Sequence, residues 1–155
     1  MSTEVGRTDG GFDVPVVERD RVELSFTLRP DLVFLARMTA AAVASRAQFG
    51  IDQVEDLRLA IDELCVTLAG AGGPDARLHL LFEWEPGTIK VLGTLLPADV
   101  DAGQPGTAPA PAPVAPPTPD ELSARILDAL VDEHGTDSTD GASRAWIVVR
   151  RTSQG

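Results

Sequence analysis

The sequence predicts a two-layer α/β (α+β) sandwich, in which a mixed, mainly antiparallel sheet is covered on one face by helices. Three observations lead to this fold class. Residues 21–29 alternate polar and apolar side chains, residues 32–47 and 52–68 carry apolar side chains at helical spacing, and residues 77–95 contain two alternating runs joined by a turn. The apolar side of such a hairpin needs a helical layer over it, and the two preceding helices can supply that layer.

The first strand and helix are indicated by a change of period at Pro30, which ends the alternating run and can open a helix. Gly50 supplies the residue that often follows the end of a helix. The apolar positions of the strand are Val22, Leu24, Phe26 and Leu28, and those of the helix are Leu32, Leu35, Ala36, Val43 and Ala47.

The second helix carries the strongest helical pattern in the chain. Asp52 and Glu55, three residues apart, resemble a capping pair at its start, and the glycine-rich residues 70–74 end it. Its unbroken apolar stripe, which we expect to be buried, consists of Val54, Leu57, Ile61, Leu64, Cys65 and Leu68.

The remaining elements follow from turn and capping signals. Glu85-Pro86-Gly87 turns the hairpin, and Thr118 and Pro119 offer an N-cap and a first helical position for a third helix. After Gly135 and a polar loop, the run 146–149 is expected to form the last strand.

Length and composition predict one domain. The chain has 155 residues, of which 43% are hydrophobic and 24% are charged, as in ordinary globular proteins. We expect a flexible tail over residues 1–14 and a single domain over residues 15–152, interrupted by a mobile Pro/Ala-rich loop at 97–117.

The charge excludes several kinds of partner. A formal net charge of -11 disfavours nucleic acid, because phosphate binding depends on lysine and arginine, and it favours a basic protein instead. No apolar run approaches the roughly 20 residues that span a bilayer, and the amino terminus lacks a secretory signal pattern. We therefore expect a cytoplasmic protein that binds neither nucleic acid nor membrane.

Candidate site residues lie on the second helix. Glu63 is on the side opposite the apolar stripe, together with the aliphatic residues Leu59 and Val66. Such a half-apolar face with a central acid can line a pocket or meet a partner, but isolated exposed aliphatic residues beside an ordinary glutamate would give the same pattern. No metal site is indicated, because neither histidine nor the single cysteine has ligand partners at a suitable spacing.

The segment VEDLRLAIDELCVTLAG, with the preceding helix FLARMTAAAVAS, resembles the opening of the RsbW and SpoIIAB anti-sigma factors and is most similar to the actinobacterial UsfX type. These proteins belong to the GHKL superfamily of ATP-binding domains, with a Bergerat-type fold. The resemblance covers nearly the whole chain by order of elements. It is specific over the first two helices.

The resemblance implies a nucleotide site on the second helix. In the family, a glutamate acts as general base and an asparagine four residues later helps to hold magnesium. Glu63 occupies the acid position, whereas Thr67 stands in place of the asparagine. Threonine has a shorter reach and no amide carbonyl, so this substitution weakens the expectation of magnesium binding.

Two further nucleotide boxes of the family are altered. The family's Asp-x-Gly motif is expected directly after the hairpin, where this chain instead has Leu95 and its neighbours; Asp101 and Gly103 form a displaced candidate. The glycine-rich box before the third helix is replaced by residues 120–123, which add two carboxylates. We therefore expect a degenerate nucleotide site with no ATP cofactor, and Mg-ATP binding is the alternative.

Arg37 matches an arginine in the first helix of the family that is implicated in contacts to both the sigma factor and its competing antagonist. The partner-binding residues that we expect are thus Arg37, Leu59 and Val66. The resemblance implies an anti-sigma factor that sequesters a sigma factor as a homodimer and is released by a STAS-type antagonist. The alternatives are an active ATP-dependent serine kinase of that antagonist, and an adaptor that binds a different regulator.

Overall fold

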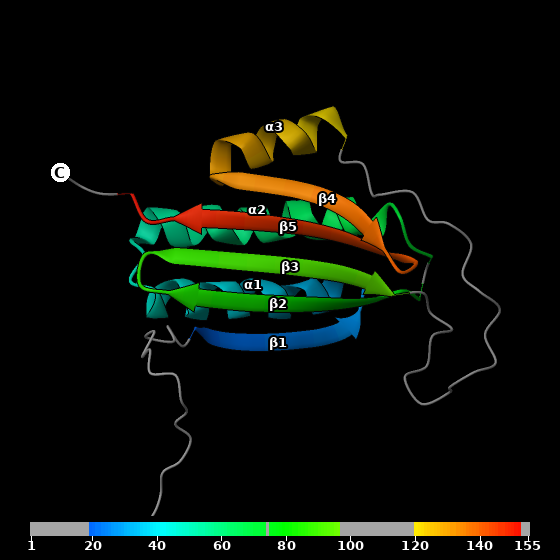
Figure 1. Ribbon diagram of the computed structural model, residues 1–155, viewed down its shortest axis with the longest axis horizontal. Helices are drawn as coiled ribbons and strands as arrows, with labels where there is room; N and C mark the ends of the chain where they lie inside the picture. The colour runs from blue at the N-terminus through cyan, green and yellow to red at the C-terminus, as the bar shows by residue number, and fades with distance from the viewer. Residues whose placement is uncertain (1–18, 74, 97–119, 153–155) are drawn as a thin grey trace, which may run out of the picture.

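The computed structural model describes residues 19–73, 75–96 and 120–152. These ranges contain five strands and three helices, whose arrangement can be followed in Figure 1. In chain order the elements are β1 (Asp20–Thr27), α1 (Pro30–Arg46), α2 (Ile51–Ala69), β2 (Arg77–Glu85), β3 (Thr88–Leu96), α3 (Glu121–Leu130), β4 (Glu133–Thr139) and β5 (Ala142–Arg150).

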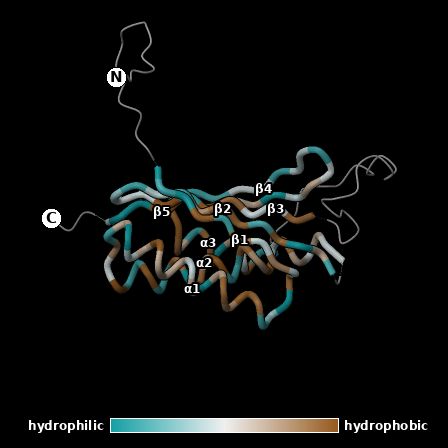
Figure 2. The backbone as a smooth tube through the Cα atoms, turned by 90° about the horizontal axis from the view of Figure 1, so that it is seen from below, coloured by the Kyte–Doolittle hydropathy of each residue, from teal (hydrophilic) through white to brown (hydrophobic). Residues whose placement is uncertain are grey.

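The strands form one sheet in the order β1-β2-β3-β5-β4, and its four strand pairs are all antiparallel. Figure 2 shows the helices on one side of this sheet. The predicted two-layer sandwich is therefore confirmed. None of the helices within the described ranges combines the length and the apolar character that crossing a bilayer requires.

The core lies between the sheet and the inner sides of α1 and α2. The α2 stripe is buried as expected from Leu57 to Leu68, including Cys65 at 3% exposure, whereas Val54 near the start of the helix is only partly buried. The largest fully buried side chains come from α2 and from the strands beneath it: Phe82, Leu57, Ile61, Leu64, Leu68, Leu78, Leu80, Ile89, Ile147 and Val91. Burial of this contiguous set fixes α2 on the sheet.

Helix α1 is buried mainly through alanines, which allow α1 to approach α2 and the sheet closely. The prediction that Leu35 belongs to its buried stripe is wrong, because this side chain is 44% exposed. The helix ends at Arg46, and Gln48, not Gly50, takes the left-handed conformation with φ 67°.

Gly50 instead serves as the N-cap of α2, which begins at Ile51. The predicted capping role of Asp52 is therefore wrong. Asp52 lies within the first turn, where its negative charge still faces the positive end of the helix dipole, and no side chain caps the helix.

The β2–β3 hairpin is confirmed, with Glu85 opposite Thr88 at the turn. Gly87 has φ 85°, a conformation that strains residues with a side chain. Its amide donates to the carbonyl oxygen of Ala47 at 3.1 Å, and its own carbonyl accepts from the amide of Arg151 at 2.7 Å. The turn thereby connects the end of α1 to the end of β5.

Helix α3 begins at Glu121, and its N-cap is Asp120, whose carboxylate accepts a hydrogen bond from the Ser123 amide at 2.7 Å. The predicted cap, Thr118, and the following Pro119 lie outside the described residues, as do the expected tail 1–14 and the expected loop 97–117. The observed cap replaces the predicted one because Asp120 precedes the first helical residue.

The last part of the chain differs from the prediction. Instead of a polar loop and one short strand, β4 and β5 form a second hairpin, turned by Asp140 (φ 53°) and Gly141 (φ 78°). Strand β4 has the polar sequence EHGTDST and lies at a sheet edge, so it lacks the apolar alternation that identifies a half-buried strand.

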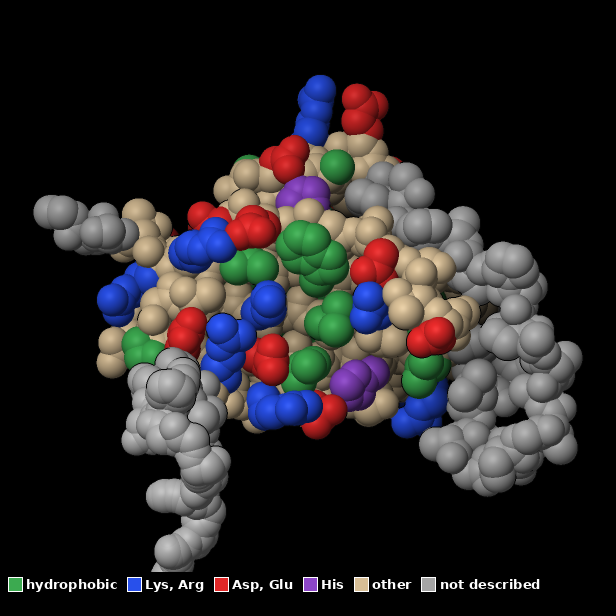
Figure 3. Space-filling model, in the orientation of Figure 1, with side chains coloured by type: hydrophobic (Ala, Val, Ile, Leu, Met, Phe, Trp, Pro, Cys, Tyr) green, Lys and Arg blue, Asp and Glu red, His purple; other side chains and the backbone are tan. Residues whose placement is uncertain are grey.

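The sheet face that the helices leave uncovered carries a mixture of charged and hydrophobic side chains (Figure 3). Trp146 on this face packs over Gly135, where an added Cβ would lie 2.5 Å from the indole ring. This contact explains a glycine within β4, because only a residue without a side chain leaves room for the ring.

Candidate functional site

Glu63 lies on α2, is half-buried, and is already engaged by α3. The Ser123 hydroxyl donates to its Oε2 at 2.6 Å, and Ser123 is only 4% exposed. Asp120 fixes the backbone of Ser123 through the N-cap hydrogen bond. The predicted acid is therefore held by a hydrogen bond between two helices. No local pattern in the sequence indicated that Ser123 would be its partner.

Thr67 lies one turn further along α2 and is 6% exposed. Its hydroxyl donates to the backbone carbonyl of Glu63 at 2.9 Å, so it points back along its own helix. The two residues thus share one side of α2, as their spacing predicts, but the threonine hydroxyl is used for a local hydrogen bond. The other two nucleotide-site candidates, Asp101 and Gly103, lie outside the described residues.

Arg37 lies on α1 and reaches across to Asp62 on α2, with its Nε 3.3 Å from the Asp62 Oδ1. Both side chains remain about one third exposed, at 37% and 32%. Within the described part of the chain, Nε is buried without a well-aligned hydrogen bond, so the contact is an ion pair of imperfect geometry. Asp62 was missed at the sequence level because its partner is on another helix.

The environment of Asp62 is only partly favourable to its charge. Burial raises the pKa of this carboxyl above 3.8, Arg37 opposes the shift, and the neighbouring Glu63 adds to it. Desolvation thus exceeds the stabilisation that the guanidinium provides. The packing of α1 against α2 therefore brings the Arg37 guanidinium and the Asp62 carboxylate together, and their mutual attraction contributes less.

Arg37 and Asp62 line a cleft of about 370 Å³ between α1 and α2. Val66, one of the predicted partner-binding residues, also lines it. The remaining lining residues are mostly apolar: Leu28, Arg29, Pro30, Val33, Cys65 and Ala69. Such a cleft, with mostly apolar walls beside guanidinium groups, can accept a side chain of a partner protein that combines aliphatic and acidic groups.

The helices also carry most of the exposed large hydrophobic side chains. Leu59 is 52% exposed and Val66 is 57% exposed, and they lie two turns apart on the outer side of α2. Seven of the eight such residues in the described ranges are helical, and only Val22 is on a strand. The helical set is Phe34, Leu35, Met38, Ile51, Leu59, Val66 and Leu122.

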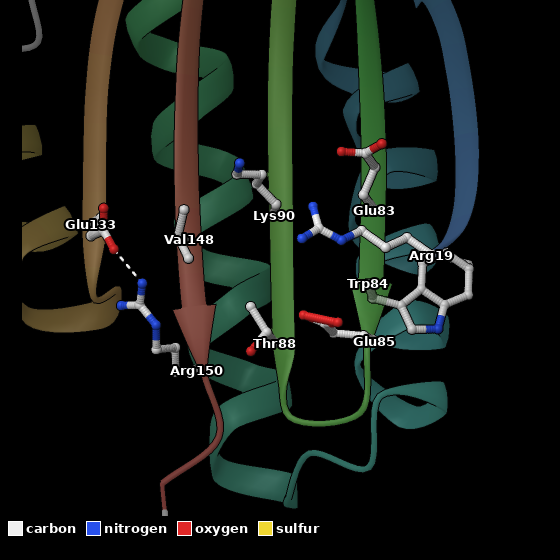
Figure 4. Close-up of a pocket in the computed structure, with 9 residues that line it drawn as sticks. All are labelled: Arg19, Glu83, Trp84, Glu85, Thr88, Lys90, Glu133, Val148 and Arg150. Carbon is white, nitrogen blue, oxygen red and sulfur yellow. Dashed lines mark hydrogen bonds and ion pairs between the residues drawn. The ribbon is translucent and has the colours of Figure 1, made fainter. Parts of the chain in front are cut away.

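A different cavity, of about 280 Å³, lies on the opposite side of the molecule (Figure 4). Most of its side chains project from the uncovered face of β2, β3, β4 and β5, and most are polar or charged, including the ion pair between Glu133 of β4 and Arg150 of β5. None of the site residues expected from the sequence lines this cavity. The candidate functional surface is therefore on the helical layer.

The fold is a two-layer α/β domain with its candidate site on α2, and the chain is similar in sequence to RsbW-type regulators over the segment that contains α2. The anti-sigma-F factor RsbW of Mycobacterium tuberculosis is 36% identical over 75 residues, which are 46% of this chain and 45% of that protein. The serine-protein kinase RsbW of Bacillus subtilis is 37% identical over 46 residues, or 30% of this chain and 29% of that protein.

The serine-protein kinase RsbW of Bacillus pumilus is 29% identical over 68 residues, covering 41% of this chain and 42% of that protein. The chain thus matches less than half the length of each of these relatives. No family model matches it. The matches confirm the resemblance to the RsbW-type family that the two-helix segment indicated.

Proposed function

We propose that this protein is an anti-sigma factor, which sequesters an RNA polymerase sigma factor on the outer surface of α1 and α2. The observation that carries the proposal is the presence of exposed hydrophobic side chains on α1 and on the outer side of α2, one of which, Val66, lines the Arg37 cleft. Exposed apolar residues surrounding an arginine are typical of protein-binding surfaces. The relative from Mycobacterium tuberculosis is named an anti-sigma-F factor, which supports this reading.

We further propose that a STAS-type antagonist releases the sigma factor by competing for the same surface, and that the protein acts as a homodimer in the cytoplasm. Under this proposal the switch depends on the relative concentrations and affinities of the two partners. The net charge of -11 favours basic surfaces on both of them.

The nucleotide site is proposed to be degenerate. Support comes from the hydrogen bonds of two residues: the Glu63 carboxylate accepts from Ser123, and the Thr67 hydroxyl donates to the backbone. A kinase would need the acid available to a substrate hydroxyl and an oxygen ligand directed at magnesium.

The second candidate is an active ATP-dependent serine kinase. It is favoured by the retained Glu63 and by the Bacillus relatives, which are named serine-protein kinases. Calorimetric titration with ATP and magnesium separates the two functions. We expect no binding in the micromolar range. Micromolar binding that Glu63→Ala abolishes would favour the kinase instead.

The sigma-factor proposal is tested by measuring the affinity of the purified protein for each sigma factor of its own host, each purified separately. We expect one to bind, and Val66→Glu to weaken that binding at least about tenfold, because it places a charge in an apolar contact. The matched control is Ile51→Glu, which changes an 83% exposed residue about 22 Å away on the same helix. Absence of binding to every sigma factor would refute the proposal.

A further inference from the structure

Asp62 places a carboxylate at a partly buried and mostly apolar position. Its carboxylate sits at the apolar α1–α2 cleft, next to the exposed Val66, although burial disfavours its charge. An aspartate that only served solubility would be more stable on the open surface. The group that it contacts is Arg37, the arginine of the proposed partner-binding surface.

The contact between the two residues is loose. The Nε of Arg37 lies 3.3 Å from the carboxylate but makes no aligned hydrogen bond among the described residues. An arginine with a bidentate carboxylate would be committed to its internal partner, whereas this geometry leaves donors of the guanidinium fork available. The pair therefore orients Arg37 at the cleft but holds it weakly enough for another carboxylate to take the place of Asp62.

The donors and walls of the cleft define what can enter it. Two arginines line the cleft, and each has a carboxylate beside it: Arg29 lies 3.6 Å from Asp31, and Arg37 lies 3.3 Å from Asp62. Both ion pairs are partly exposed, so their guanidinium groups stay within reach of an incoming carboxylate beside the apolar walls. The complementary occupant is a protein segment that carries a carboxylate beside an aliphatic side chain: the carboxylate reaches Arg37 and the aliphatic group reaches the apolar walls.

We infer that Asp62 is a positioning residue that acts as an internal competitor for Arg37, so that a partner carboxylate must displace it to bind. The inference rests on the proposed function, because it assumes that a partner binds at this cleft. Asp62 then sets the affinity of the site for its partner. It keeps Arg37 extended toward the cleft in the free protein, and it lowers the binding free energy gained when an acidic segment of the partner pairs with Arg37.

A double-mutant cycle tests this role. The probe is the sigma factor that binds the unmodified protein in the test above, and the variants are Asp62→Asn, Arg37→Ala and the double variant. We expect Asp62→Asn to tighten binding about two- to fivefold, the size typical of a partly exposed ion pair, and to have no effect in the Arg37→Ala background. Asp62→Glu preserves the competing carboxylate, so this variant should bind with an affinity close to that of the unmodified protein.

The pH profile provides a readout that a purely structural role would not change. The charged or titratable groups facing Asp62 are Arg37 from α1 and Arg58, Glu63 and Cys65 from α2, with Arg29 at the cleft rim. Protonation of Asp62 should mimic the asparagine variant, so the affinity gain of Asp62→Asn should shrink as the pH falls.

Asp52→Asn is the matched control, since it removes the same charge from an exposed position on α2. Asp62 is not a competitor if Asp62→Asn leaves the affinity unchanged or weakens it. The same holds if the affinity increase persists in the Arg37→Ala background, or if Asp52→Asn causes an equal increase. If the unmodified protein binds no sigma factor, the proposed function fails and this inference fails with it. Binding without the expected cycle overturns only the role of Asp62.

Discussion

A buried hydroxyl on α3 donates to the Glu63 carboxylate, so this acid already has a partner inside the chain. Ser123→Ala removes the donor and leaves a half-buried carboxylate oxygen unsatisfied. We expect this variant to lose about 1–3 kcal/mol of unfolding free energy in urea denaturation, because hydrogen bonds to charged groups are the costly ones to break.

Ser45→Ala is the control for that change. This serine is exposed on α1, and alanine has the higher helix propensity, so stability should stay the same or rise slightly. In the Glu63→Gln background the effect of Ser123→Ala should shrink, since the charged acceptor is gone. An equal loss in both backgrounds would show that the hydrogen bond contributes little.

The raised pKa of the Asp62 carboxyl leads us to expect a specific pH dependence of the unfolding free energy. Its pKa in the folded chain is raised above the ordinary 3.8, mainly by burial, so between these two values the native state binds more protons than the unfolded state. The contribution of Asp62 to stability is therefore full below pH 3.8 and is lost as the pH rises through the folded-state pKa. Asp62→Asn should remove this dependence.

The measurement is the difference in unfolding free energy between the unmodified protein and Asp62→Asn, taken from pH 3.5 to pH 7. The difference should move in favour of the variant as the pH rises. A change in the opposite direction would mean that Arg37 outweighs desolvation at this site.

Local sequence patterns located the candidate side chains but not their partners. The spacing of Leu59, Glu63 and Val66 placed them on the outer side of α2, where all three are at least partly exposed. Ser123 is 60 residues away from Glu63, and Asp62 meets an arginine on another helix. Such contacts depend on how the helices pack, which no helical periodicity encodes.

Among the strands, β4 depends on a glycine beneath an aromatic ring. Gly135→Ala would place a Cβ 2.5 Å from the Trp146 indole, and we expect a loss of about 1–3 kcal/mol in unfolding free energy as the ring is displaced. Gly73→Ala is the control, because an added Cβ there meets no atom within 4 Å. Similar stability for both variants would show that the ring moves aside without cost.

Elements with an apolar side were predictable, and those without one were not. The α2 stripe and the β2–β3 hairpin carry the helical and the alternating pattern over their full lengths, because each buries one side. Strand β4 buries no large apolar side chain and is paired on one side by β5. Its only sequence signal was the Asp140-Gly141 turn that follows it.

The single cysteine lies on α2 and is buried beside the cleft between α1 and α2. Cys65 is 3% exposed, and desolvation raises the pKa of its thiol to about 12. We expect the folded protein to react with a thiol reagent at pH 7.5 at least about 100-fold more slowly than the urea-unfolded chain, because reaction requires α1 and α2 to move apart. Equal rates would mean that α1 and α2 separate readily.

The position of β5 in the sheet has a consequence for synthesis. Although β5 is last in sequence, it lies between β3 and β4, and α2 packs against it through the buried core. A ribosome-bound chain that has not yet released residues around 150 lacks an interior strand, so α2 has no complete support. Under the proposed function, we expect partner binding to begin only after translation has passed this point.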